Sequence, residues 1–307
     1  MPYVELPRVD RATCRALAEA RWHGMATAKP DLAPAIALQR KLIGLVDDLA
    51  AQFGAGRVPR LSLPPRYLTT KLRAGIPALS GEPIQVPIDV LQPTFVELCR
   101  ALAQGGGGEA TLQILTAAES GQLDVRSVLL LALQRQQGAL RVAATRAGLG
   151  HDLLWLVADL GISPFAHALL GSLFGAAPEP LAAALNAWGR GYCPLCGSWP
   201  TLIERLGDAR RLRCSLCASA WDLPDGSCVY CGEHGGSFGV ITPDPSRSGR
   251  TIDTCRTCKG YTKAVDTVAS APFPLVAITD LDSMDLDLFA MQASFTRPAL
   301  KNFVARR

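Results

Sequence analysis

The first 190 residues carry apolar side chains at helical intervals. One run repeats them every three or four residues, which is the spacing of a single face of an α-helix. This stripe consists of Leu38, Leu42, Leu45, Leu49 and Phe53. Asp31 is placed to cap the helix and Gly54 to end it. A second stripe follows Pro93 and consists of Phe95, Leu98, Cys99 and Leu102. Segments rich in Ala and Leu predict further helices over 109–119, 122–147, 150–174 and 178–190.

Three stretches depart from the plain helical pattern. Residues 57–92 are rich in proline and predict irregular structure with one short helix near 67–73. The four glycines at 105–108 predict a flexible loop, because they lack the Lys-Ser/Thr ending of a phosphate-binding loop. Residues 160–178 hold no charged side chain, but glycines and a proline interrupt them. This favours a buried core helix, with a break near Ser163-Pro164, over a membrane span.

The pattern changes near residue 190. Cysteine, glycine, aromatic and β-branched residues then occur in short runs, separated by turn signals such as Gly207-Asp208 and Pro224-Asp225-Gly226. Runs of this kind predict short strands. Because small strand-rich modules cannot build a large core of their own, we expect a metal-stapled region after Tyr192.

Eight of the ten cysteines lie in four C-x-x-C pairs inside this region. The pairs are Cys193/Cys196, Cys214/Cys217, Cys228/Cys231 and Cys255/Cys258. A two-residue spacer lets a tight turn aim both sulfur atoms at one metal ion, so each pair is half of a four-thiolate site. The four pairs therefore predict two metal ions, each in a four-cysteine site, with these eight residues as ligands.

The cysteine region is an internal duplication. Each unit holds two pairs, which are 17 residues apart in the first unit and 23 residues apart in the second. The units cover roughly 192–223 and 227–267. Gly197 and Gly232 directly follow the second cysteine of the leading pairs, where the missing side chain lets backbone N–H groups turn toward the thiolates. Interleaved pairing, first with third and second with fourth, is the alternative.

Composition and charge narrow the chemistry. The chain has 307 residues, of which 49% are hydrophobic and 19% charged, and a formal charge of +4. This is typical of a globular protein of about two domains, with little attraction for nucleic acid or an anionic membrane. The sequence starts without a secretory signal pattern, so we expect a cytoplasmic location, where thiols stay reduced. Metal binding is then favoured over disulfides or thiol catalysis, and an all-thiolate site suits both zinc and iron.

The other polar candidates have simpler explanations. Cys14 and Cys99 are expected to pack in the core, and His151, His167 and His234 to be a helix start, a core residue and a surface residue. The arginines of the first hairpin predict a solvated face; they are Arg205, Arg210, Arg211 and Arg213. The acidic residues Asp280, Asp282, Asp285 and Asp287 lack the glycine and the terminal glutamate of a calcium loop. Capping and dipole effects at the last helix explain them. Because no catalytic constellation is complete, the sequence does not predict an enzyme.

The cysteine motifs resemble those of the bacterial formate dehydrogenase accessory proteins. The motifs are Tyr192-Cys193-Pro194-Leu195-Cys196-Gly197-Ser198 with Pro200, Arg213-Cys214-Ser215-Leu216-Cys217 with Trp221, Cys228-Val229-Tyr230-Cys231, and Cys255-Arg256-Thr257-Cys258 with Tyr261 and Lys263. Asp280-Leu281 and Leu286-Asp287 match weakly. Two features depart from the pattern: the turn at 223–226, and Lys259 in place of a glycine, where weaker hydrogen bonding is expected at the fourth pair.

The resemblance implies a multihelical N-terminal domain and two tandem rubredoxin-like modules that bind iron. It also implies a cytoplasmic role in maturing respiratory formate dehydrogenase, by binding its catalytic subunit before export. We expect a helical domain over 1–190, rubredoxin-like (zinc-ribbon-like) modules over 191–226 and 227–270, and a segment over 271–307 with a helix packing back. A redox or electron-transfer protein and a zinc-ribbon nucleic-acid-binding protein are the alternatives.

Overall fold

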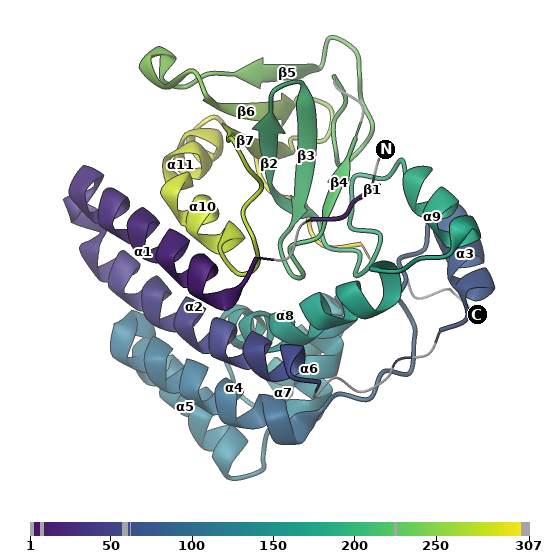
Figure 1. Ribbon diagram of the computed structural model, residues 1–307. Helices are drawn as coiled ribbons and strands as arrows, with labels where there is room; N and C mark the ends of the chain where they lie inside the picture. The colour runs from purple at the N-terminus through teal and green to yellow at the C-terminus, as the bar shows by residue number, and fades with distance from the viewer. Residues whose placement is uncertain (1–2, 7–8, 57–60, 62, 224–225, 302–307) are drawn as a thin grey trace. The chain divides into compact units, whose positions relative to one another are not determined.

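The computed structural model describes residues 3–6, 9–56, 61, 63–223 and 226–301. These residues form two units. The helical unit comprises residues 10–56 and 79–173, and the sheet unit comprises the first strand, residues 63–78 and the chain from residue 174 onward. Figure 1 shows the elements of both units along the chain.

Long helices with one buried face build the helical unit (Figure 1). They are α1 (Arg11–Ala28), α2 (Ala33–Gly54), α4 (Ile88–Leu102), α5 (Gly108–Glu119), α6 (Val125–Leu133), α7 (Gln137–Arg146) and α8 (His151–Phe174). Helix α2 packs on α4, and the rings of Phe53 and Phe165 lie 5.5 Å apart between α2 and α8. All four positions of the stripe after Pro93 are buried, as are Cys14 and Cys99.

Two helix starts differ from the sequence-based expectation. Helix α2 follows a 3₁₀ turn, Pro30–Leu32, and no side chain caps it, so the predicted cap by Asp31 is wrong. The 3₁₀ turn leads directly into the helix, and Asp31 lies within this turn. Helix α4 begins at Ile88, five residues before Pro93. Pro93 is tolerated because it is exposed, so water can bond the carbonyl that loses its N–H partner.

Helix α8 runs unbroken through Pro164, so the predicted break is wrong. A proline at 164 leaves the carbonyl of residue 160 without its helical donor. The Ser163 hydroxyl lies 3.0 Å from the Leu160 carbonyl oxygen and donates to it instead. Among the described residues, α8 is the one helix long and apolar enough for a membrane by length and composition, and 56% of its apolar window is buried. Core helices of globular proteins share these properties.

The glycine-rich connection between α4 and α5 is a short kink between two helices, where the sequence predicts a flexible loop. Within Ala103–Gly107, Gly106 leaves the helical conformation with φ 118°. A Cβ atom on Gly105 would lie 2.4 Å from a methyl carbon of Leu38. The glycines therefore serve close packing between α2 and this kink. The predicted helix over 122–147 is interrupted between α6 and α7, at Arg135 with φ 57°.

The sheet unit holds one seven-stranded sheet in the order β1-β4-β3-β2-β7-β6-β5. The strands are β1 (Tyr3–Val4), β2 (Pro200–Leu206), β3 (Ala209–Cys214), β4 (Ala220–Asp222), β5 (Phe238–Ile241), β6 (Arg250–Cys255) and β7 (Tyr261–Asp266). Only the central pair β2–β7 is parallel; the other described pairs are antiparallel. Gly207-Asp208 makes the β2–β3 turn as predicted, whereas Pro224 and Asp225 lie outside the described residues.

The register of the strands shows the duplication. Pro200 of β2 pairs with Cys214, and Phe238 of β5 pairs with Cys255 in the same way. Strands β2–β3–β4 therefore correspond to β5–β6–β7. The two repeats join edge to edge, because β2 of the first pairs with β7 of the second. A helical region followed by a β-sheet region with two cysteine clusters confirms the predicted fold class.

Four shorter helices complete the sheet unit (Figure 1). They are α3 (Pro65–Arg73), α9 (Glu179–Asn186), α10 (Val276–Asp282) and α11 (Met284–Gln292). Helix α3 matches the short helix predicted near 67–73 and packs on α9. Helix α11 packs on β6 and β7. Its Leu286 and Ala290 share a buried cluster with Ile252 and Tyr261, and this apolar contact holds the last helices on the second repeat.

Candidate metal centres

Each C-x-x-C pair forms a tight turn closed by the same backbone hydrogen bond. The N–H of the first cysteine donates to the carbonyl of the fifth residue after it. The N···O distances are 2.9 Å for Cys193 to Ser198, 2.9 Å for Cys214 to Ser219, 2.8 Å for Cys228 to Glu233 and 2.9 Å for Cys255 to Gly260. The closing bond of the turn at Lys259 is therefore as short as in the other three turns.

The residue after the second cysteine has positive φ in all four turns. Gly197 and Gly232 have φ 80° and 78°, the conformation in which glycine is favoured. Ala218 and Lys259 adopt φ 56° and 58° despite their side chains. This conformation turns backbone N–H groups inward: the N–H groups of Leu216 and Cys217 lie 3.4 and 3.5 Å from the Cys214 sulfur. The turn geometry thus favours thiolates at each pair.

The eight paired cysteines gather into two clusters. The first contains Cys193, Cys196, Cys214 and Cys217, and the second Cys228, Cys231, Cys255 and Cys258. Within each cluster all sulfur atoms lie within 4.8 Å of one another, which excludes the interleaved pairing. All ten cysteines of the chain are free of disulfides. His234 is exposed, and neither cluster includes a histidine among the described residues.

The sulfur separations fit a tetrahedral ion. Metal–sulfur bonds of about 2.3 Å at tetrahedral angles place two sulfurs roughly 3.8 Å apart. In the first cluster the sulfur atoms of Cys193 and Cys217 lie 3.7 Å apart, and those of Cys196 and Cys214 lie 3.4 Å apart. In the second, the sulfur atoms of Cys228 and Cys258, and those of Cys231 and Cys255, lie 3.6 Å apart. Each cluster can therefore hold one metal ion through four thiolates.

The two clusters differ in exposure to solvent. In the first, all four cysteines are buried, with at most 3% of any residue exposed. In the second, Cys231 is exposed and Cys258 half-buried. Strand β1 lies in the first repeat, where it adds to the edge of β4 by pairing Tyr3 with Trp221. Burial and the nearby thiols Cys217 and Cys193 raise the pKa of Tyr3, in keeping with its position beside the first cluster.

Serine hydroxyls support the first cluster and have no counterpart in the second. Ser219 Oγ lies 3.0 Å from Cys193 Sγ, and Ser198 Oγ lies 3.2 Å from Cys196 Sγ. The same positions of the second repeat are Gly260 and Glu233. Hydrogen bonds to thiolates and burial both change the affinity and the potential of a bound metal. The two centres are therefore chemically unequal.

The thiol pKa values follow these surroundings. Burial raises the pKa of Cys193 and of Cys217 well above the ordinary value, and it also raises the pKa of Cys228 and of Cys258 in the second cluster. Burial also acts to raise the pKa of Cys255, but hydrogen bonds from the Cys258 N–H and from other donors outweigh it and lower the pKa to about 7. The first cluster is buried, so its thiolates need a cation to offset their charge.

The sequence predicted that the arginines of the first hairpin form a solvated face, and this prediction is wrong. Arg213 and Glu204 are buried, and their Nη1 and Oε2 atoms lie 2.6 Å apart. Arg213 Nη2 also donates to the carbonyl of Ala218, the positive-φ residue of the second turn, at 3.0 Å. Arg210 pairs with Asp253 of the second repeat at 2.5 Å. Because these side chains are almost completely buried, their charges require partners within the sheet unit.

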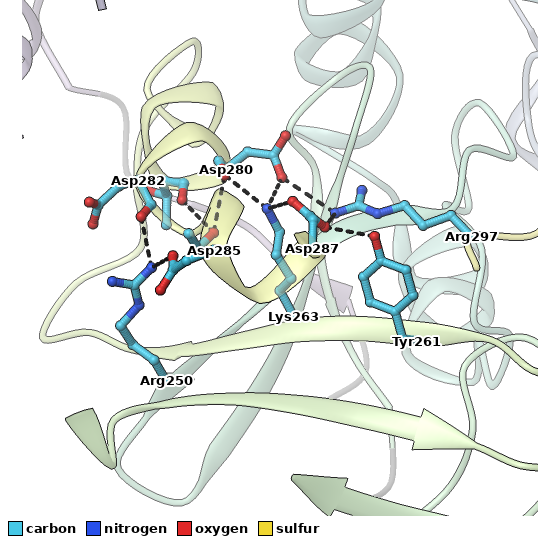
Figure 2. Close-up of polar contacts among 10 residues, drawn as sticks. Arg250, Tyr261, Lys263, Asp280, Asp282, Asp285, Asp287 and Arg297 are labelled. Carbon is cyan, nitrogen blue, oxygen red and sulfur yellow. Dashed lines mark hydrogen bonds and ion pairs between the residues drawn. The ribbon is translucent and has the colours of Figure 1, made fainter. Parts of the chain in front are cut away.

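The acidic residues near the last helices bind basic side chains (Figure 2). Lys263 has no exposed side-chain surface, and its Nζ lies 2.6 Å from Asp280 Oδ1 and 2.7 Å from Asp287 Oδ2. Arg297 reaches the same carboxylates from the other side, at 3.5 and 2.9 Å. Asp285 and Asp287 do lie in the first turn of α11. However, capping alone does not explain the cluster, since a buried lysine on β7 recruits it.

The role of Lys263 in the sheet unit was not predicted from the sequence. A hint is present in its position, because Lys263 lies on a strand between Thr262 and Ala264. All three residues are buried, and a buried charged side chain requires partners. The carboxylates that satisfy it come from helices α10 and α11, about twenty residues later. Pattern reasoning within a strand does not reveal such partners.

Together, the fold and the clusters define a class of protein. It has a helical unit and one sheet made of two repeats, each with a four-cysteine cluster able to hold a metal ion. No protein-family model matches the chain. A relative from Rhizobium meliloti, "Protein FdhE homolog", is 25% identical over 302 residues, covering 87% of this chain and 92% of the relative.

Other comparisons agree. The Aquifex aeolicus "Protein FdhE homolog" is 30% identical over 115 residues, and "Protein FdhE" from Escherichia coli is 29% identical over 119 residues. These two matches span only 40% and 38% of the relatives' lengths. The crystal structure of the FdhE protein from Pseudomonas aeruginosa superposes with a TM-score of 0.61, at 22% identity, over 100% of this chain and 99% of that one, which shows the shared fold. The chain is therefore similar to FdhE proteins over most of its length.

Proposed function

We propose that this chain is a metal-binding accessory protein for the maturation of respiratory formate dehydrogenase. The observation that carries the proposal is the pair of closed four-cysteine clusters. Each cluster offers four thiolates to one ion, which leaves no open position for a substrate. A centre of this kind holds a protein surface in shape or carries electrons, which suits an accessory protein and not a catalyst.

The client that we propose is the catalytic subunit of formate dehydrogenase, bound in the cytoplasm before export. The similarity to FdhE proteins and the cysteine motifs support this link. The eight cysteines are the proposed ligands of two ions, and iron is the metal that the resemblance favours. Zinc fits the same sulfur geometry. In this proposal the metals fix the four turns, and the sheet unit presents the surface that meets the client.

Electron transfer is the second candidate, and the exposure of Cys231 favours it. A metal held by an exposed thiolate can exchange electrons with a partner, whereas the buried first cluster is shielded. Nucleic-acid binding has less support, because Arg205, Arg210 and Arg213 are engaged in ion pairs within the sheet. A binding surface for phosphates needs free cationic side chains.

Capture from formate-respiring cells tests the client. Tagged protein is expected to enrich the formate dehydrogenase catalytic subunit, quantified by mass spectrometry against a tag-only control. A variant with Cys193, Cys196, Cys214 and Cys217 all replaced by serine is expected to lose the enrichment, because two turns of the sheet unit lose their metal. Equal amounts of the subunit in wild-type and tag-only captures would contradict the proposal.

Elemental analysis of anaerobically purified protein tests the metals. Two ions per chain are expected, and iron in a four-thiolate site gives visible charge-transfer absorption that bleaches on reduction. A colourless protein with two zinc ions would exclude electron transfer and leave the structural role. A protein without metal would refute both candidates.

A further inference from the structure

The segment Thr296–Lys301 lies on the sheet unit outside any helix or strand, and none of its residues is buried. Its backbone forms a parallel bridge from Thr296 to Gly260, and the Thr296 N–H donates to the Lys259 carbonyl at 2.8 Å. Farther along, the Trp199 indole N–H donates to the Ala299 carbonyl at 3.0 Å. Every residue of the segment is exposed or half-buried. Polar contacts therefore hold it, which is typical of segments that detach at low cost.

Arg297 makes the first of two side-chain anchors. Its guanidinium pairs with Asp287 at 2.9 Å and with Asp280 at 3.5 Å, and lies 5.6 Å from the centre of the Tyr261 ring. Figure 2 shows it entering from the side opposite Lys263. The two aspartates carry two negative charges, and Lys263 is fixed beside them without exposed surface. Lys263 neutralises one of these two charges, and Arg297 neutralises the other.

Lys301 makes the second anchor. Its Nζ lies 4.9 Å from the ring centre of Tyr192 and 5.2 Å from that of Trp199, the geometry of a cation–π contact with two rings. The rings are braced by edge-to-face contacts: Tyr192 with Trp199 at 5.8 Å and Trp199 with Tyr230 at 5.0 Å. Tyr192 and Trp199 flank the first cysteine turn, and Tyr230 lies within the third. The two metal repeats thus build this aromatic site jointly.

We propose that this surface is a binding site for an extended polypeptide segment with two cationic side chains four residues apart, and that Thr296–Lys301 occupies it as a tethered stand-in. An acidic site with an aromatic wall receives the first cation, and an aromatic pair receives the second. The occupant is a basic stretch of the client, so this inference rests on the proposed function. Binding of the client segment displaces Thr296–Lys301 and exposes the aromatic pair.

A peptide with the sequence of residues 295–301 tests the site without any client. Labelled peptide is titrated with full-length, metal-loaded protein, and binding is followed by fluorescence anisotropy. In the wild type the tethered segment competes at a local concentration in the millimolar range, so binding is weak. The double variant Arg297→Gln/Lys301→Gln weakens the competitor and keeps the site. It is expected to bind the peptide at least about tenfold more tightly than the wild type.

Two controls identify the site. Adding Trp199→Leu to the double variant is expected to abolish the gain, because one ring and the indole donor are lost. A peptide with glutamine in place of its arginine and lysine is expected not to bind the double variant. Metal content and unfolding midpoint confirm that each variant is folded. If the double variant fails that check, Lys301→Gln alone replaces it, with an expected gain of about threefold.

A folded tail variant that binds the peptide no more tightly than the wild type would overturn the inference. Thr296–Lys301 would then be a permanent part of the sheet unit. Undiminished binding after Trp199→Leu would overturn it as well. The assay contains no formate dehydrogenase, so peptide binding with failed capture of the catalytic subunit would refute the proposed client and leave the site standing. Capture without peptide binding would refute the site alone.

Discussion

Replacing Glu204 with glutamine is expected to destabilise the sheet unit more than the replacement of an exposed charged side chain does. Glu204 and Arg213 have 2% and 0% of their side-chain surface exposed. Glu204 Oε2 accepts from Arg213 at 2.6 Å, and Oε1 accepts from the Ala271 N–H at 2.9 Å. Glutamine offers one acceptor oxygen in place of two, so one buried donor must face an amide NH₂ group, and the guanidinium loses its counter-charge.

Breaking one side of a buried ion pair costs about 3–5 kcal/mol, because the other charge stays buried and unpaired. This lowers the midpoint of thermal unfolding by roughly 6–20 °C for a unit of this size. The second cysteine turn is also expected to loosen, since Arg213 holds the carbonyls of Ala218 and Ala271 at 3.0 and 2.7 Å. The assay is urea and thermal unfolding at equal metal load, followed by circular dichroism.

Asp266→Asn is the matched control within the same sheet. Asp266 pairs with Arg205 at 2.6 Å, but 59% of its side chain is exposed. Loss of such a surface pair costs about 0.2–1 kcal/mol. If Glu204→Gln destabilises the protein by no more than Asp266→Asn, the reasoning from burial is wrong for this pair.

Three further predictions concern the metals, the packing of the turns and pH. With a chelator in excess, metal is expected to leave in two phases whose rates differ at least about tenfold, because the second cluster is exposed and lacks hydroxyl support. The Cys231→Ser variant is expected to lose the fast phase. Gly191→Ala is expected to destabilise the sheet unit by about 1–3 kcal/mol in urea unfolding, because a Cβ atom would lie 1.7 Å from the Val229 carbonyl oxygen. Burial acts to raise the pKa of Asp280, but the charges of Lys263 and Arg297 outweigh it and lower the pKa. The resulting stability is present above the unfolded pKa of about 3.9 and is lost as the pH falls through the folded pKa. The difference in unfolding free energy between wild type and Asp280→Asn should therefore be full at neutral pH and shrink below about pH 4.

Each of these has a control or a contrary outcome. Cys14→Ser should leave both metal phases unchanged, since Cys14 belongs to neither cluster; a single phase in the wild type would refute the inequality of the centres. Gly236→Ala should be nearly neutral, because nothing lies within 4 Å of its added Cβ. A constant difference for Asp280→Asn from neutral pH to well below its pKa would show that its charge does not act through Lys263 and Arg297.

Local patterns determined most of the secondary structure and the membership of the clusters. A C-x-x-C pair is a turn of a few residues, and the spacers of 17 and 23 residues are each long enough for a strand, a turn and a returning strand. Which two C-x-x-C pairs combine into one four-cysteine site therefore follows from chain connectivity. Helix periodicity is equally local, which is why the stripes around Phe53 and Phe95 lie in helices, while helix starts, such as α4 at Ile88, depend on neighbouring packing.

Charged side chains show where sequence patterns stop being sufficient. The spacing of Arg210 and Arg213 indicates an exposed hairpin when the hairpin is taken alone. In the folded chain, the second repeat adds its strands to β2 and places Asp253 within reach of Arg210. The physical reason is that burial of a strand face is decided by what covers it, and the cover comes from residues distant in sequence.

The sequence by itself therefore determined that this protein has a helical region and two four-cysteine clusters, since both follow from contacts between near neighbours along the chain. Only the tertiary structure decided that the two clusters are unequal. Strand β1 comes from the opposite end of the chain and pairs with β4 of the first repeat, whereas β7, the corresponding strand of the second repeat, pairs with β2. The same holds for Lys263, whose partners Asp280 and Asp287 are brought to it by helices that pack on the sheet. Solvent exclusion and charge pairing act through space, so they are properties of the assembled fold.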